Sequence, residues 1–232
     1  MEYSDLIPER EAETTGLTAV DFGGLLTPGL QLMLDGGKTG CGGKLWPAGE
    51  LLGKYVITHF NPSGMGVNTP SQDFETALDF SQFKHVLELG SGTGLCGLAL
   101  GLATTDVECY ITDQQPMLEL IKANIALNGL DKRAFARVLN WGEELSSEYD
   151  DIDLVLAADC VYLEAAFPLL EKTLIDITNK RNVPILMAYK KRRKADKRFF
   201  KSIRKHFIVQ ESGYEYDENQ VYLFLLTRKL WV

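Results

Sequence analysis

The sequence predicts an α/β fold: a mostly parallel sheet of seven strands with helices on both faces and a C-terminal antiparallel hairpin strand. From residue 85 onward, short continuous apolar runs alternate with segments whose apolar residues recur every three or four positions. Such runs are typical of strands buried on both faces, and their alternation with helices is typical of parallel pairing. The last two runs have no helix between them, which favours an antiparallel pair at one edge.

The chain before this alternation is less regular. Residues 1–45 are rich in glycine and turn residues, and we expect them to form an irregular N-terminal extension. Residues 46–232 are expected to form one α/β domain. Its first element is a predicted helix over residues 46–60, where Pro47 suits a first turn. A loop over residues 61–72 and a short helix over residues 74–80 follow.

The elements of the predicted sheet then come in order. Strands are predicted over residues 85–89, 107–112, 135–139, 154–158, 183–189, 207–212 and 221–227. Helices are predicted over residues 94–103, 116–128, 167–177 and 195–205, each with apolar residues at helical spacing. No internal repeat interrupts this order, so a single domain accounts for it.

Composition excludes several classes of protein. None of the apolar runs among the 232 residues approaches the ~20 needed to cross a bilayer, and the acidic N-terminus has no apolar signal region. We therefore expect a cytoplasmic protein without membrane contact, acting as a monomer. The four cysteines contain no C-x-x-C pair and lie far in sequence from the three histidines, so we expect free thiols and no metal site.

Charge is unevenly distributed along the chain. The net charge is −8, yet residues 190–205 hold ten basic side chains and one acidic. An acidic body with one basic segment argues against a nucleic-acid partner. The segment could be a solvated helix face or a nuclear localisation signal, and we favour a docking surface for an acidic region of a partner protein.

A glycine loop is the sharpest local signal. A strand runs into Gly90, Ser91, Gly92 and Gly94 and a helix follows, so the backbone can approach a ligand at a helix N-terminus. Asp113 ends the next strand, 23 residues after Gly90, where a carboxylate can accept hydrogen bonds from ribose hydroxyls.

Two classes of cofactor fit this loop. Residues 92–97 read G-x-G-x-x-G, which is compatible with a nicotinamide or flavin dinucleotide. Glu88 lies two residues before the first glycine and would repel a pyrophosphate. Its charge suits a ligand with an ammonium group, such as the methionine moiety of S-adenosylmethionine.

A second candidate site follows the strand over residues 154–158. Asp159 and Tyr162 come at its carboxyl end, and ligands of open parallel sheets bind at carboxyl ends. Asp159 could simply cap the following helix. The functional interpretation is a carboxylate and an aromatic wall at the site of the methyl acceptor.

These motifs together resemble the seven-β-strand (class I), Rossmann-like protein-lysine methyltransferases. The resemblance rests on Trp46 in GGKLWPAGELL, on ELGSGTG, on Asp113, on the Asn140-Trp141-Gly142 triplet and on Asp159-x-x-Tyr162. More narrowly, the D-x-x-Y signature is that of methyltransferase family 16. AADCVYLEAAFPLLEKTL and ILMAYKKRRKADKRFF are similar to the fungal enzymes that methylate elongation factor 1-alpha. The resemblance covers roughly residues 38–210.

The resemblance implies a role for each matching residue. The cofactor would be S-adenosylmethionine, with S-adenosylhomocysteine as product, bound by Trp46, Glu88, Gly90, Ser91, Gly92, Gly94, Asp113, Trp141 and the backbone of Ala158. Asp159 and Tyr162 would shape the lysine channel. Residues 46–232 would then be the methyltransferase domain, and a translation factor, elongation factor 1-alpha, the substrate.

Three other functions stay open at this point. The same cofactor site could serve an RNA or small-molecule methyltransferase, although the motif after the fourth strand is not of the N/D-P-P-Y type common in RNA enzymes. A dinucleotide-dependent oxidoreductase would lack a second catalytic domain. A non-catalytic interaction module could keep the fold.

Overall fold

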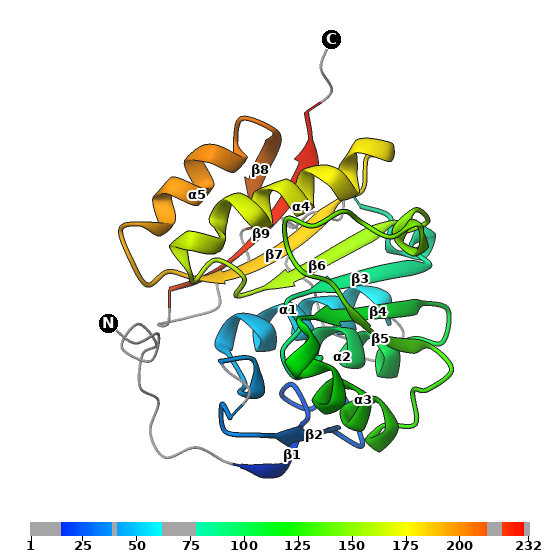
Figure 1. Ribbon diagram of the computed structural model, residues 1–232. Coiled ribbons are helices and arrows are strands. Elements are labelled where there is room, and N and C mark those ends of the chain that lie inside the picture. The colour runs from blue at the N-terminus through cyan, green and yellow to red at the C-terminus, as the bar shows by residue number, and fades with distance from the viewer. Residues whose placement is uncertain (1–14, 39–40, 62–77, 213–219, 230–232) are drawn as a thin grey trace.

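A seven-stranded mixed sheet forms the centre of the molecule (Figure 1). The computed structural model describes residues 15–38, 41–61, 78–212 and 220–229. The strands lie in the order β5-β4-β3-β6-β7-β9-β8, and only the pairs that involve β9 are antiparallel. Their bounds are β3 His85–Leu89, β4 Glu108–Asp113, β5 Ala134–Val138, β6 Leu154–Ala158, β7 Ile185–Lys190, β8 Phe207–Glu211 and β9 Val221–Arg228.

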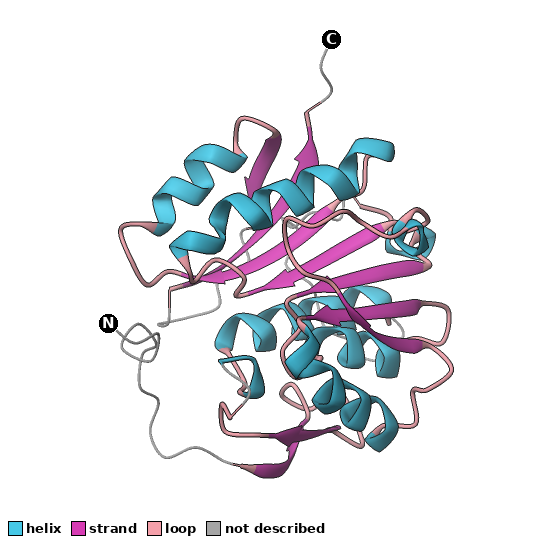
Figure 2. Cartoon of the chain, viewed as in Figure 1, coloured by secondary structure: helices cyan, strands magenta, loops and turns pink. Residues whose placement is uncertain are grey.

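Helices cover both faces of this sheet (Figure 2). The helices α1 (Pro47–Phe60), α2 (Leu95–Ala103) and α3 (Leu118–Leu127) share one hydrophobic core with one face. The other core holds α4 (Phe167–Lys180) and α5 (Asp196–Ile203). Neighbouring strand residues such as Val86 and Leu87 belong to opposite cores, because successive side chains of a strand point to opposite faces. This explains why the strands are continuously apolar.

The predicted fold class is confirmed, and so is the hairpin at one edge. β8 and β9 pair antiparallel, and β9 lies between β7 and β8 in the sheet. The chain passes from β3 through α2 to β4 on one side of β3, and it later returns to place β6 on the other side. Because both neighbours are parallel to β3, the carboxyl ends of β3, β4 and β6 are adjacent. This is the topological position at which open α/β sheets bind ligands.

The N-terminal segment differs from the expected irregular extension. β1 (Gly16–Val20) and β2 (Leu30–Leu34) form an antiparallel hairpin. Leu30, Leu32 and Leu34 are buried in the same core as α1 to α3. The period-two pattern LQLML, with alternate leucines, was the signal that could have predicted this strand.

Two asparagines, Asn124 in α3 and Asn128 directly after that helix, fix this hairpin to the domain. The Asn124 side chain accepts from the Met33 amide (2.7 Å) and donates to its carbonyl (3.2 Å). Asn128 makes the same pair of contacts with Gln31, at 2.9 and 2.7 Å. Because the asparagines are one helical turn apart, their side-chain amides bond the backbone N–H and C=O groups along the outer edge of β2, as a neighbouring strand would.

The remaining expected elements before the sheet are only partly visible. Most of the helix expected over residues 74–80 and of the loop over 61–72 lies outside the described residues; a short 3-10 helix covers Phe80–Gln82. Within the described ranges, the helices are all too short or too polar to cross a membrane.

Candidate active site

A cavity of about 680 Å³ opens at the carboxyl ends of β3, β4 and β6. Its volume is within the range of small-molecule sites. Ten of the eleven residues predicted for the site line it: Trp46, Glu88, Gly90, Ser91, Gly92, Asp113, Trp141, Ala158, Asp159 and Tyr162. The eleventh, Gly94, does not line the cavity; it is the N-cap residue of α2 and has a left-handed backbone at φ 82°.

The glycine loop is shaped so that no side chain could replace its glycines. Gly90 and Gly92 have φ values of 56° and 57°, a conformation that favours glycine. A Cβ on Gly90 would lie 2.8 Å from Cζ2 of Trp141, and one on Gly92 would lie 2.5 Å from the carbonyl oxygen of Gly42. The bare backbone therefore borders the cavity, and the turn at Gly42 packs directly on it.

Glu88 supports this loop from below. Its side chain is buried, and its two oxygens accept from the amides of Cys96 (3.2 Å) and Gly97 (2.8 Å) in the first turn of α2. A carboxylate there satisfies helix-terminal donors and interacts favourably with the helix dipole. Burial nevertheless raises the pKa of Glu88 to about 7.

Asp113 lies across the loop at the end of β4. Its Oδ2 accepts from the amide of Gly92 (2.8 Å), and its Oδ1 accepts from the amide of Gln114 (2.7 Å). Burial raises its pKa above the ordinary value, against the lowering effect of these two bonds. Next to it, the buried Oγ of Ser91 has no hydrogen-bond partner.

Two tryptophans form aromatic walls of the cavity. Trp46 precedes α1, and its indole Nε1 donates to the carbonyl of Cys41 at 2.9 Å. Trp141 comes from the loop after β5 and packs against Gly90 and the core under α4. Its neighbour Gly142 has φ 85° and donates its amide to the hydroxyl of Thr173 in α4, at 2.8 Å.

The third side of the cavity is formed by the segment after β6. Asp159 has a left-handed backbone at φ 58°, which is uncommon for a residue with a side chain. Its amide donates to the carbonyl of Ala188 at 2.8 Å. Its carboxylate caps no helix, since it bonds Lys190 and Arg192 instead. The helix-cap interpretation of Asp159 is therefore wrong.

Tyr162 stands at the rim of the cavity. The residue keeps 39% of its surface exposed, while its hydroxyl lies against the side chain of Cys41. Burial of the hydroxyl and the contact with Cys41 raise the pKa of Tyr162 well above its usual value. The tyrosine is therefore neutral at physiological pH and can donate one hydrogen bond.

Sequence reasoning missed several residues of the site. Arg192 binds both carboxylate oxygens of Asp159 and lies over Trp46, with its Cζ 5.2 Å from the ring centroid. Cys41, Gly42 and Met117 also line the cavity. Arg192 lies within a run of five consecutive basic residues, and nothing in the sequence distinguishes it from its neighbours.

The residues present fit S-adenosylmethionine. The unpartnered Ser91 hydroxyl and the bare glycine backbone can receive the polar methionine and ribose parts, and the cavity walls add carboxylates and tryptophans. The sulfonium cofactor carries positive charges that these groups favour. Together with the sheet order, the site defines a class I S-adenosylmethionine-dependent methyltransferase.

Solved structures support this fold. The chain superimposes on the methyltransferase SibL with a TM-score of 0.53 at 15% identity, covering 65% of this chain and 52% of that one. The O-methyltransferase NcsB1, solved with S-adenosylmethionine, gives 0.52 at 15% identity, covering 68% and 53%. The chain thus spans about half the length of these two proteins, and the likeness shows the fold.

Sequence comparisons identify the family. A family model described as lysine methyltransferase matches residues 26–206, and the chain belongs to that family. It is 46% identical to the protein-lysine N-methyltransferase EFM6 of Saccharomyces cerevisiae, over 98% of this chain and 97% of that protein. It is 40% identical to the protein N-lysine methyltransferase METTL21A of Danio rerio, over 57% and 61%. The enzyme is therefore a protein-lysine N-methyltransferase, which excludes the oxidoreductase and the non-catalytic module.

Proposed function

We propose that this enzyme methylates a lysine ε-amine of a translation factor, elongation factor 1-alpha, in the cytoplasm. The observation that carries the lysine site is the continuity of one cavity from the glycine loop to Asp159 and Tyr162. The target is supported by the similarity of two segments, residues 157–174 and 185–200, to fungal enzymes that methylate this factor.

The cofactor half of the cavity binds and orients. When bound, S-adenosylmethionine supplies a methyl group activated by its sulfonium sulfur. Gly90, Ser91 and Gly92 line its methionine and ribose parts, Asp113 accepts from the ribose hydroxyls, and Trp46 packs against it. Trp141 and the backbone of Ala158 complete the wall, while Glu88 and Gly94 fix the start of α2 under the loop.

The acceptor half aligns the amine. Methyl transfer is an in-line displacement, so most of the rate enhancement must come from positioning and electrostatics. Asp159 accepts a hydrogen bond from the amine and directs its lone pair, and Tyr162 offers a ring face beside the channel. The lysine must be neutral to attack, although its reference pKa is ~10.4.

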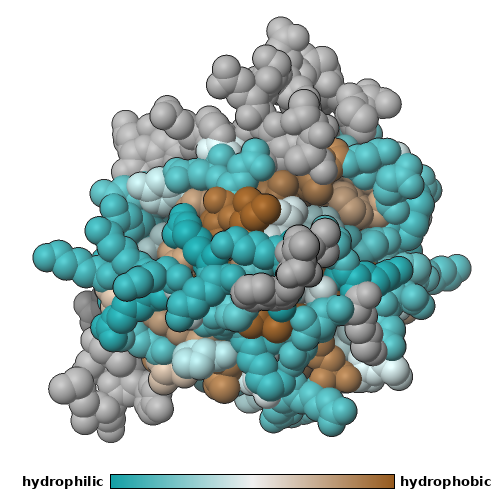
Figure 3. All heavy atoms as spheres, turned by 90° about the horizontal axis from the view of Figure 1, so that it is seen from above, coloured by the Kyte–Doolittle hydropathy of each residue, from teal (hydrophilic) through white to brown (hydrophobic). Residues whose placement is uncertain are grey.

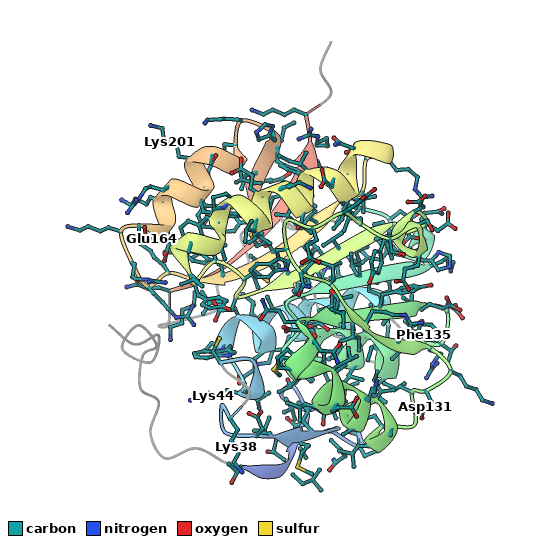
Figure 4. All side chains as sticks on the ribbon, in the orientation of Figure 1. Lys38, Lys44, Asp131, Phe135, Glu164 and Lys201 are labelled. Atoms are coloured by element: carbon teal, nitrogen blue, oxygen red, sulfur yellow. The ribbon has the colours of Figure 1, made fainter. Side chains whose placement is uncertain are left out.

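A basic face beside the cavity suits an acidic region of the substrate. We define it as Lys191, Lys194, Lys197, Lys201 and Lys205, which are exposed and make no ion pair with another described residue. Lys201 lies on the outer side of α5 (Figure 4). Seen from above, this side of the molecule is mostly hydrophilic (Figure 3). The face continues from Arg192 and Arg193, which line the cavity.

Labelled methyl transfer into a fungal cell extract tests the proposal. The enzyme should label one band that co-migrates with elongation factor 1-alpha, and the Asp159→Asn variant should not. Purified elongation factor 1-alpha should be labelled as well. Label in a different protein would overturn the target, and label in RNA or in small molecules would overturn the acceptor assignment.

A further inference from the structure

The acceptor carboxylate is already bonded by an arginine. Nη1 of Arg192 lies 2.6 Å from Oδ1 of Asp159, and Nη2 lies 2.6 Å from Oδ2. The amide of Lys190 also donates to Oδ1, at 3.3 Å. Such a two-pronged pair is among the strongest and most directional ion pairs in proteins. An amine that enters the cavity therefore meets a paired carboxylate.

The arginine is itself held from several sides. Its side chain is only 14% exposed, it stacks on Trp46, and its Nη1 donates to the carbonyl of Lys190 at 3.3 Å. Its backbone amide faces the buried carboxylate of Asp196, at 3.4 Å. Leaving this position would unstack the guanidinium and expose Asp159 as an unpaired buried charge. Arg192 is thus a fixed part of the site.

The pair keeps one position free for the substrate. A carboxylate has about four lone-pair positions, and the bonds to Arg192 and Lys190 use two on Oδ1 and one on Oδ2. The remaining position on Oδ2 can accept one N–H from a lysine amine. Orientation by Asp159 therefore does not require Arg192 to move.

The charge of the pair decides which form of lysine is favoured. An unpaired Asp159 would stabilise the lysine ammonium and raise its pKa, which opposes attack. Arg192 cancels that charge while the hydrogen bond remains. Other titratable groups line the same cavity or face Arg192. Those that line the cavity are Cys41 and Lys44 from the N-terminal turn, Glu88 and Asp113 from β3 and β4, Cys96 in α2, Glu143 after β5, Cys160 and Tyr162 after β6, and Arg193. Tyr189 and Asp196 face Arg192 from β7 and α5.

We propose that Arg192 is a positioning residue that neutralises Asp159, so that the acceptor lysine binds as the free amine. This rests on the proposed acceptor role of Asp159. The lysine ammonium loses its proton to solvent before the methyl group is transferred. The nitrogen lone pair then forms the N–CH3 bond while the S–CH3 bond breaks and leaves its electrons on sulfur, so the product is the methylated ammonium.

The dependence of kcat on pH gives the first test, because it reports the protonation of groups in the enzyme–substrate complex. In Arg192→Gln the rising limb of the kcat–pH profile should shift to higher pH by at least about one unit. The kcat near pH 7 should therefore fall about tenfold or more and recover at high pH. Arg192→Lys keeps the positive charge, so the rising limb of the pH profile should stay in place. Its kcat should be lowered several-fold, because lysine cannot make the two-pronged bond of the guanidinium. An equal loss for Arg192→Gln at every pH would overturn the proposal.

Binding of butylamine, a mimic of the lysine side chain, gives a test that needs no protein substrate. With S-adenosylhomocysteine bound, Arg192→Gln should bind butylammonium about tenfold more tightly near pH 7 than the unmodified enzyme. Asp159→Asn/Arg192→Gln removes both charges and should match the unmodified enzyme within about threefold, since a paired site is already neutral. If the unmodified enzyme binds far more tightly than this double variant, Arg192 leaves Asp159 during binding and the proposal fails.

These readouts separate failure of the inference from failure of the proposed function. S-adenosylhomocysteine affinity, measured by calorimetry, shows whether each variant keeps the fold of the site. If the unmodified enzyme labels no elongation factor, the target is wrong, while butylammonium binding still tests the charge of the pair. If Arg192→Gln does not fold, the comparison of the unmodified enzyme with the double variant decides alone.

Discussion

The two halves of the cavity hold their carboxylates in different ways. In the cofactor half, Glu88 and Asp113 accept from the backbone amides of Cys96, Gly97, Gly92 and Gln114, and Glu88 also has a hydrogen bond with the Cys96 thiol. In the acceptor half, Asp159 is held by a guanidinium, with one weaker backbone bond. Backbone donors are fixed by the fold, whereas a side-chain partner can be exchanged by one substitution. The cofactor half is therefore constrained by the chain path, and the acceptor half by the choice of side chains.

The difference also concerns charge. No basic side chain of the described residues is bonded to the carboxylates of the cofactor half, and burial raises the pKa of both. Their full negative charge is favoured when a positively charged ligand is present. Asp159 has its counter-charge built in, which suits an acceptor that must bind as a neutral amine.

The largest effect is expected from removing the acceptor carboxylate. Asp159→Ala leaves the Arg192 guanidinium buried without its partner, which costs about 3–5 kcal/mol of stability. Methyl transfer should be abolished, while S-adenosylmethionine affinity should change by less than about threefold. Thermal unfolding, calorimetry and transfer of label measure the three quantities. Asp159→Asn, which keeps the shape, is the matched control; loss of cofactor binding in this folded control would break the division into two halves.

The buried glutamate gives the next effect, on stability. Because its pKa rises from 4.5 to about 7 on folding, the native state keeps a proton that the unfolded state loses in this window. Stability should therefore fall as pH rises from about 4.5 to 7, by about 3 kcal/mol, and then level off. Unfolding by denaturant across this range should show the fall in the unmodified protein. Glu88→Gln should lack this part of the slope, and equal slopes would contradict the burial argument.

A smaller effect is expected at Asp113. Asp113→Ala removes the acceptor for the amide of Gly92 and the proposed partner of the ribose hydroxyls. A lost charged hydrogen bond should weaken S-adenosylmethionine binding about tenfold to hundredfold. Butylamine affinity should stay unchanged, which sharpens the comparison between the two halves. Unchanged cofactor affinity in calorimetry would remove the ribose role, and Asp113→Asn serves as the conservative control.

The smallest effect is expected at the basic face. Lys197→Ala/Lys201→Ala should raise KM for the protein substrate a few-fold and leave kcat unchanged, because exposed charges guide association. The effect should disappear as added salt screens the charges. Lys84→Ala/Lys132→Ala removes two exposed lysines elsewhere and should leave KM unchanged. A salt-independent KM in the unmodified enzyme would exclude a docking role for this face.

Much of the fold could be predicted because its signals are local. The apolar run of β3, the glycines after it and the helical spacing of α2 each specify their own element. The N-terminal hairpin was missed because the glycines on either side of LQLML outweighed its period-two pattern. The hairpin is held by Asn124 in α3 and by Asn128 directly after it, which lie 91 and 97 residues from their partners in the sequence.

The sequence by itself determined the α/β class, the cofactor loop with Asp113, and the position of Asp159 and Tyr162 at the end of a strand. Only the tertiary structure decided that Arg192 bonds Asp159 across 33 residues and that the turn at Gly42 packs on Gly92. The physical reason lies in the sheet order. β7 pairs with β6, so the loop after β7 meets the end of β6. Periodicity and turn chemistry specify elements one at a time, whereas contacts between elements depend on how the whole chain packs.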